Sequence, residues 1–186
     1  MQSKRSSIFQ NSELRTPHSE LEGKKTMLSI TILCVGRLKD AFFEDAAKEY
    51  GKRLTAYAKV NTVELKAADL PQEPSVAEVS AALEKEGAEI LKKIPSGARV
   101  VALCVEGKPY SSEELADYFN ACANAGCSHI VFIIGGSCGL SENVKRAAHL
   151  RLSMSRMTFP HRLARVMLLE QIYRACKINA GEKYHK

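Results

Sequence analysis

The stretch IVFIIGGSCG, residues 130–139, decides the fold class. Its first five residues are continuously apolar, whereas a half-exposed strand would alternate apolar with polar side chains. The glycines that follow end the strand and begin a loop. A strand buried on both faces is typical of a parallel sheet that helices cover on both sides.

On either side of this stretch, strand-like runs alternate with helical patterns. Further strands are predicted at residues 28–35, 60–65, 99–105 and 150–155. Apolar residues at helical spacing predict helices over about 40–57, 75–93, 112–125 and 160–178. The predicted fold class is therefore α/β, with a mostly parallel sheet and helices on both faces. Ligands of such sheets bind beyond the carboxyl ends of the strands.

Local signals refine the expected boundaries of these elements. Ser112 and Ser141 are expected to cap the helices that follow them. Gly107, Lys108 and Pro109 are expected to form a turn after the strand at 99–105. Pro160 is expected to open the last helix.

Composition points to one globular domain. The chain has 186 residues, of which 45% are hydrophobic and 26% charged. Residues 1–26 hold few apolar groups and are interpreted as a disordered leader or a start-site artefact, which leaves residues 27–186 as a single domain. No apolar run reaches the roughly 18 residues of a membrane-spanning helix, so a cytoplasmic protein without membrane contact is expected. The six cysteines form no C-x-x-C pair, and no metal site is predicted.

The glycine loop by itself does not identify a ligand. Its G-G-x-x-G spacing differs from the G-x-G-x-x-G fingerprint of dinucleotide-binding folds, and no Gly-Lys-Ser/Thr follows as in a P-loop. A tight strand-to-helix turn and a close approach of backbone to a flat ligand both explain the glycines.

The last predicted helix carries the strongest functional signals. His161 and Arg165 fall on its apolar side, where they either line a polar pocket or form structural contacts, since an unpaired buried charge is costly. Apolar residues also occur on the opposite arc, which favours packing against a second subunit in a homodimer. Residues 146–186 carry nine Lys or Arg against two Asp or Glu, a balance that suits a polyanionic partner.

Three blocks of the sequence resemble one family closely. FIIGGSCGL (132–140), LSMSRMTFPHRLARVMLLEQIYRA (152–175) and KYHK (183–186) are similar to the ribosomal large-subunit pseudouridine N3-methyltransferases of the SPOUT superfamily. The resemblance covers residues 27–186. It implies a C-terminal deep trefoil knot, a homodimer, S-adenosylmethionine as methyl donor, and methylation of N3 of a pseudouridine in 23S rRNA of the assembled ribosome.

The resemblance also implies where the site residues are. The expected cofactor-binding residues are Leu103, Gly135, Met154, Ser155, Arg156, Met157, Thr158 and Phe159. Chemistry and place in the motif suggest His185 as the first candidate for the base and His161 as the second, with Arg165 as an orienting cation and Tyr184 as a stacking platform. The pair Ser137-Cys138 departs from the family, which commonly has an acid there.

Two other functions remain open at this point. A non-catalytic RNA-binding or ribosome-assembly protein could use the same scaffold, and a knotted methyltransferase could act on tRNA instead. Cofactor binding separates the first from an enzyme, and the terminal Tyr-His block argues against the second through resemblance.

Overall fold

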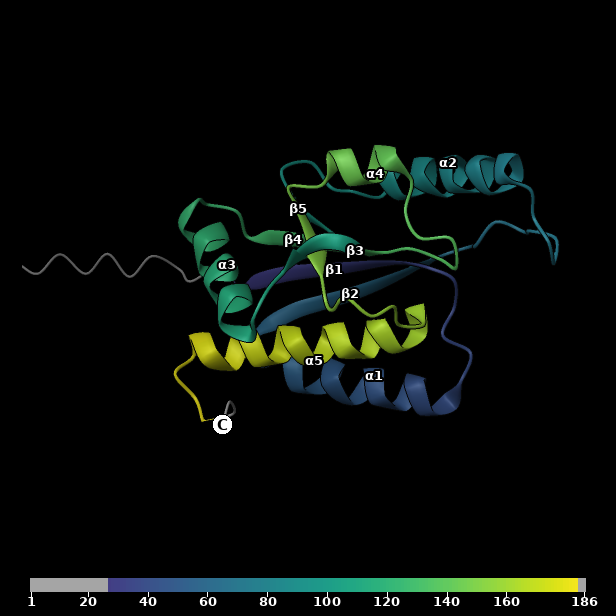
Figure 1. Cartoon of the computed structure of the whole chain (residues 1–186). Coiled ribbons are helices and arrows are strands. Elements are labelled where there is room, and N and C mark those ends of the chain that lie inside the picture. The colour runs from purple at the N-terminus through teal and green to yellow at the C-terminus, as the bar shows by residue number, and fades with distance from the viewer. Residues whose placement is uncertain (1–26, 184–186) are drawn as a thin grey trace, which may run out of the picture.

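A five-stranded parallel sheet runs through the middle of the computed structural model, which describes residues 27–183 (Figure 1). The strands are β1 (Leu28–Val35), β2 (Ala58–Leu65), β3 (Arg99–Pro109), β4 (His129–Ile134) and β5 (Leu150–Ser153). Their order in the sheet is β2-β1-β4-β3-β5, and every neighbouring pair is parallel. The predicted α/β class and the parallel sheet are confirmed.

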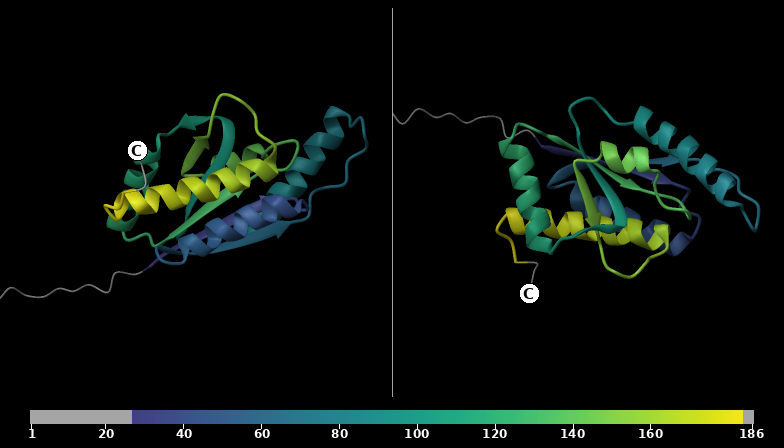
Figure 2. Two further views of the ribbon diagram at one scale, coloured as in Figure 1. Left: turned by 90° about the horizontal axis from the view of Figure 1, so that it is seen from below. Right: turned by 45° about the horizontal axis from the view of Figure 1, so that its top comes forward.

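Helices cover both faces of this sheet. They are α1 (Ala41–Leu54), α2 (Val76–Lys92), α3 (Ser112–Asn124), α4 (Glu142–Ala147) and α5 (His161–Asn179). One face packs against α1, α3 and α5, and the other packs against α2 and α4 (Figures 1 and 2). Seen from below, α1 and α5 lie side by side under the sheet (Figure 2).

The apolar run that predicted a doubly covered strand forms the central strand β4. Phe132 is fully buried in the cluster beneath α1, α3 and α5, while Val131 and Ile133 are fully buried in the cluster beneath α2 and α4. Successive side chains of a strand point to opposite faces, so both faces must be apolar when both are covered. This explains why the run does not alternate.

Serine side chains fix the start of several helices. Ser75 and Ser111 each accept a hydrogen bond from the backbone N–H three residues on and form capping boxes with Glu78 and Glu114. Ser141 caps α4 as predicted, by accepting from the Val144 N–H. The prediction of Ser112 as a cap was wrong by one residue, since the reciprocal bond needs Glu at the third helical position and Glu114 stands three residues after Ser111.

The carboxyl half of β3 differs from the prediction. Instead of turning at residues 107–109, the strand continues to Pro109 and rejoins β5, with Lys108 opposite Leu152. The register shifts between Leu103 and Lys108, so residues 104–107 bulge away from regular pairing. A Cβ on Gly107 would lie 2.8 Å from the Arg151 carbonyl, so glycine is what allows the strands to approach here. Strand β5 is also shorter than predicted and ends at residue 153.

Some expectations lie outside these observations. The predicted leader, residues 1–26, is not among the described residues, and the trefoil knot stays a prediction. Within residues 27–183, no helix combines the length and the apolar character needed to cross a membrane.

Candidate active site

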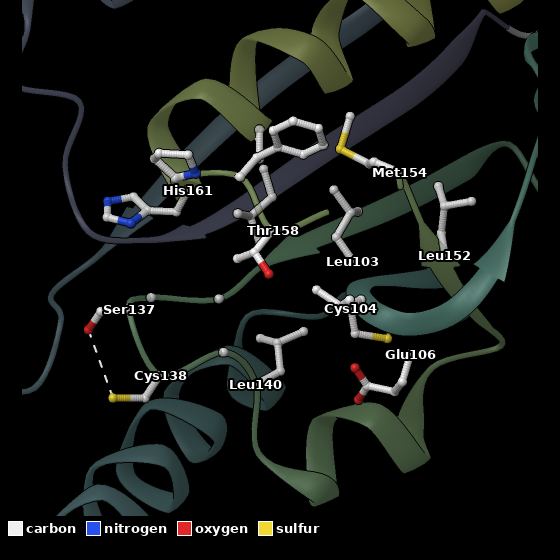
Figure 3. Close-up of a pocket in the computed structure, with 18 of the residues that line it drawn as sticks. Leu103, Cys104, Glu106, Ser137, Cys138, Leu140, Leu152, Met154, Thr158 and His161 are labelled. Carbon is white, nitrogen blue, oxygen red and sulfur yellow. Dashed lines mark hydrogen bonds between the residues drawn. The ribbon is translucent and has the colours of Figure 1, made fainter. Parts of the chain in front are cut away.

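A cavity of about 680 Å³ opens beside the bulge of β3, where β4 and β5 end (Figure 3). Its walls come from residues 103–106 of β3, from the ends of β4 and β5, from the loops at 135–140 and 154–160, from Lys145 on α4, and from the first turn of α5. Neighbouring parallel strands bring their carboxyl ends to one edge, which is where ligands of open α/β sheets bind. The volume lies within the range of small-molecule sites.

The glycine loop forms one wall of this cavity through its backbone. A Cβ built on Gly135 would lie 2.2 Å from the Gly139 carbonyl oxygen, so the loop folds back on itself too closely for any side chain there. Gly139 has φ +85° and donates its N–H to the Gly136 carbonyl at 3.1 Å. The glycines are therefore needed for the turn itself, and the same turn borders the cavity.

The segment after β5 forms the facing wall. Ser153 Oγ donates to the Ser155 carbonyl at 2.9 Å, and the Met157 N–H donates to Ser155 Oγ at 3.0 Å. These two bonds fold the segment over the end of the strand. Of the predicted cofactor residues, Leu103, Gly135, Met154, Ser155, Met157, Thr158 and Phe159 line the cavity. Arg156, which lies in the bend of this segment, does not line it.

His161 is the imidazole of the cavity. It begins α5, directly after the wall segment, and its Nε2 lies 3.4 Å from the Cβ position of Gly36, a residue with φ +94°. Burial, reinforced by the neighbouring Arg162 guanidinium, lowers the pKa of His161 below its ordinary value. The ring is therefore neutral at pH 7 and can accept a proton.

Arg165 lies one turn along the helix but does not line this cavity. Its Nη1 lies 2.6 Å from Oε1 of Glu64 on β2, and its side chain is 12% exposed. Partial burial would raise the pKa of Glu64, but the hydrogen bonds from Arg165 and from the Leu38 N–H outweigh it and lower the pKa. Of the two alternatives that the sequence left open, a polar pocket or a structural contact, Arg165 forms the structural contact, an ion pair with Glu64. Its role as an orienting cation stays a prediction.

The sequence did not point to two charged residues that line the cavity. Glu106 on the bulged part of β3 and Lys145 on α4 form an ion pair, with Nζ and Oε1 2.6 Å apart. Glu106 was missed because β3 was expected to turn away after residue 105. Lys145 was missed because only the position of α4 over the sheet brings it to the cavity, and no local pattern signals that.

The predicted tail residues Tyr184 and His185 lie outside the described residues. The chain before them is held by Glu182, which accepts a hydrogen bond from Tyr57 Oη at 3.0 Å and pairs with Lys177. Among residues 27–183, no three His, Cys, Asp or Glu side chains are grouped so as to hold a metal ion.

Comparison with known proteins identifies the family. A family model described as "Predicted SPOUT methyltransferase" matches residues 28–185. The ribosomal RNA large subunit methyltransferase H of Pelotomaculum thermopropionicum is 50% identical over 159 residues, which cover 86% of this chain and 99% of that protein. The proteins of the same name from Clostridium novyi and Bifidobacterium animalis subsp. lactis are each 49% identical over 86% of this chain and all of their own length. On this evidence the chain belongs to the SPOUT methyltransferase family.

Proposed function

We propose that this protein is an S-adenosylmethionine-dependent methyltransferase that modifies N3 of a pseudouridine in 23S rRNA of the assembled ribosome. The observation that carries the proposal is the single cavity in which Leu103 at the start of the β3 bulge, the turn at Gly135 and the segment 154–159 meet beside His161. Relatives near 50% identity are named as ribosomal RNA large subunit methyltransferases. The activity is proposed for the cytoplasm, where ribosomes are.

The lining of the cavity fits this cofactor. Leu103, Ile134 and Leu152 offer apolar walls for the adenine ring, while the glycine turn offers backbone groups for hydrogen bonds (Figure 3). A sulfonium would be repelled by a dense cationic lining, and Lys145, the one Lys or Arg side chain among the described lining residues, is neutralised by Glu106. When bound, the cofactor supplies an electrophilic methyl group.

The protein's own residues would orient the substrate and take its proton. Methyl transfer needs N3 in line with the bond that breaks, so most of the rate enhancement comes from positioning. The N3 proton must also leave, and the neutral imidazole of His161 can accept it at a ring nitrogen. His185 is the first candidate for this role, His161 the second, and Tyr184 is proposed to stack on the base.

A homodimer is part of the proposal. Leu163, Val166 and Met167 on α5 are only half-buried within one chain, so this helix keeps apolar surface beyond its contacts with α1 and α3. Such surface favours packing on a second copy. Sedimentation at micromolar protein should give the mass of two chains, and a monomer would contradict the dimer.

The decisive experiment is methylation of ribosomes that lack this modification, with labelled S-adenosylmethionine and mapping of the labelled base. Ribosomes that already carry the methyl group are the matched control and should take up no label. Label in tRNA would support the tRNA alternative instead. RNA binding without any cofactor binding would support a non-catalytic assembly protein.

A further inference from the structure

An ion pair faces the cavity at the end away from His161. Figure 3 shows Glu106 near α4, on the opposite side of the cavity from His161. Lys145 Nζ lies 2.6 Å from Glu106 Oε1 and 3.0 Å from Glu142 Oε1. Among the described lining residues, no other Asp, Glu, Lys or Arg is present.

The irregularity of β3 is what brings Glu106 to this place. Between Leu103 and Lys108 the strand leaves its register with β5, and residues 104–106 line the cavity instead. The close approach of Gly107 to the backbone of β5 anchors the end of the bulge. Bulges of this kind re-aim side chains next to active sites.

Both side chains of the Glu106–Lys145 ion pair are partly exposed. The Lys145 side chain is 16% exposed and that of Glu106 is 53% exposed, so a ligand in the cavity can reach both charges. The hydrogen bond that Lys145 donates to Glu106 keeps the pKa of Lys145 above its ordinary value, and the bond that it donates to Glu142 adds to this. Lys145 thus has a second carboxylate partner in Glu142, 3.0 Å from its Nζ, besides Glu106.

The chemistry of the pair selects one part of the cofactor. The ribose diol needs an acceptor such as a carboxylate and has no use for an adjacent ammonium. The amino-acid part of the cofactor carries an ammonium and a carboxylate on the same α-carbon, so it needs both signs of charge close together. Two opposite charges fixed side by side before binding are preorganised for this group.

Resting on the proposed function, we propose that Glu106 and Lys145 bind the amino-acid zwitterion of the cofactor. The Glu106 carboxylate accepts hydrogen bonds from the α-ammonium, and the Lys145 ammonium donates to the α-carboxylate. The apolar walls then hold the adenosine part, and the pair sets how far the amino-acid chain extends in the cavity.

Calorimetry with two ligands tests this. S-adenosylhomocysteine carries the zwitterion, and 5′-methylthioadenosine keeps the adenosine and the sulfur but lacks it. Glu106→Gln and Lys145→Met should each weaken S-adenosylhomocysteine about tenfold or more, because a charge-assisted hydrogen bond is lost. The same variants should change the affinity for 5′-methylthioadenosine by less than about twofold, a change too small for a lost charged hydrogen bond.

Glu142→Gln is the matched control, since Glu142 also pairs with Lys145 but does not line the cavity, and it should leave both affinities unchanged.

Other outcomes would overturn the assignment. Equal weakening of both ligands would mean that the pair only supports the cavity wall. An effect of Glu142→Gln as large as that of Glu106→Gln would mean that Lys145 acts by holding α4. If the wild type binds S-adenosylhomocysteine and the variants bind it equally well, this inference fails and the proposed function stands, whereas a wild type that binds neither ligand overturns both. Glu106→Gln preserves shape and leaves Lys145 paired with Glu142, so it carries the test if Lys145→Met does not fold.

Discussion

Replacing Gly135 with alanine should damage the cofactor wall from within. The new Cβ would lie 2.2 Å from the Gly139 carbonyl oxygen and 2.5 Å from its carbon, both of them backbone atoms. To reach an ordinary contact of 3.4 Å, the carbonyl must retreat by about 1.2 Å, the difference between 3.4 and 2.2 Å. That movement strains the hydrogen bond between Gly136 and Gly139, which closes the turn.

The expected cost follows from this geometry. Forcing one extra carbon into a packed site usually destabilises a protein by about 1–3 kcal/mol. For a chain of this size such a loss lowers Tm by several degrees. The displaced turn also borders the cavity, so we expect the affinity for S-adenosylhomocysteine to fall about tenfold or more if one backbone hydrogen bond to the ligand is lost.

The assay pairs denaturant unfolding with calorimetry, and α1 supplies the control. Gly51 is a helical glycine with no atom within 4 Å of its Cβ position, so Gly51→Ala should raise stability by about 0.5–1 kcal/mol and leave ligand affinity unchanged. The reasoning is refuted if Gly135→Ala unfolds at the same denaturant concentration as the wild type and binds the ligand equally well. Loss of binding with unchanged stability would instead mean that the methyl group displaces the ligand and spares the turn.

Three further predictions concern His161, the ion pair between Glu64 and Arg165, and the C-terminal tail. The pKa of His161 is lowered in the folded protein, so as pH falls the imidazole takes up a proton in the unfolded chain before it does so in the folded one. The wild type should therefore lose stability as pH falls below about 6.5. Urea titrations at pH 7.5 and 5.5 should show a smaller loss of stability for His161→Gln, and equal losses would count against a buried neutral ring. Glu64→Gln should cost about 1–3 kcal/mol at pH 7 by leaving Arg165 without its carboxylate. Since the pKa of Glu64 is lowered, this difference should shrink as pH falls below 4.5, and a gap that persists in acid would contradict the ion pair as its cause. Truncation after Lys183 keeps the contacts of Glu182 with Tyr57 and Lys177, so Tm and cofactor affinity should be preserved while methyl transfer is lost. Full methyltransferase activity of both this variant and His185→Ala would mean that the tail has no part in the mechanism.

The sequence predicts the elements of this fold better than their ends. The pattern finds strand β4 because burial on both faces requires a continuous apolar run. It finds the start of helix α5 because a proline stands directly before the first helical residue. Strand β3 is not bounded correctly, because Gly107 and Pro109 look like turn residues while their real reason is contact with β5. That contact joins residues more than forty positions apart, and local patterns do not contain it.

The same limit applies to the candidate site. Gly135 and the segment 154–159 follow strand ends, and Leu103 lies near the end of the strand predicted at 99–105, so strand patterns together with the family resemblance point to them. The meeting of Glu106 with Lys145 depends on the bulge of β3 and on the position of α4, neither of which is written in local spacing. For Arg165, the helical spacing correctly predicted a position on the apolar side of the last helix. The spacing could not show whether Arg165 lines a pocket or pairs with a residue of another element, here Glu64 on β2.

The strand order also sets when during synthesis the protein can fold. Strand β1 has β4 as its neighbour on one side, and Ser29 pairs with His129, one hundred residues later. The centre of the sheet therefore cannot form until more than two thirds of the chain has been made. Until then, the edge of β1 that will pair with β4 has no partner strand. Pairings so distant in sequence also fold slowly, because the loop between them must close before any contact forms. The newly made chain is consequently exposed to aggregation for longer than one whose neighbouring strands follow each other.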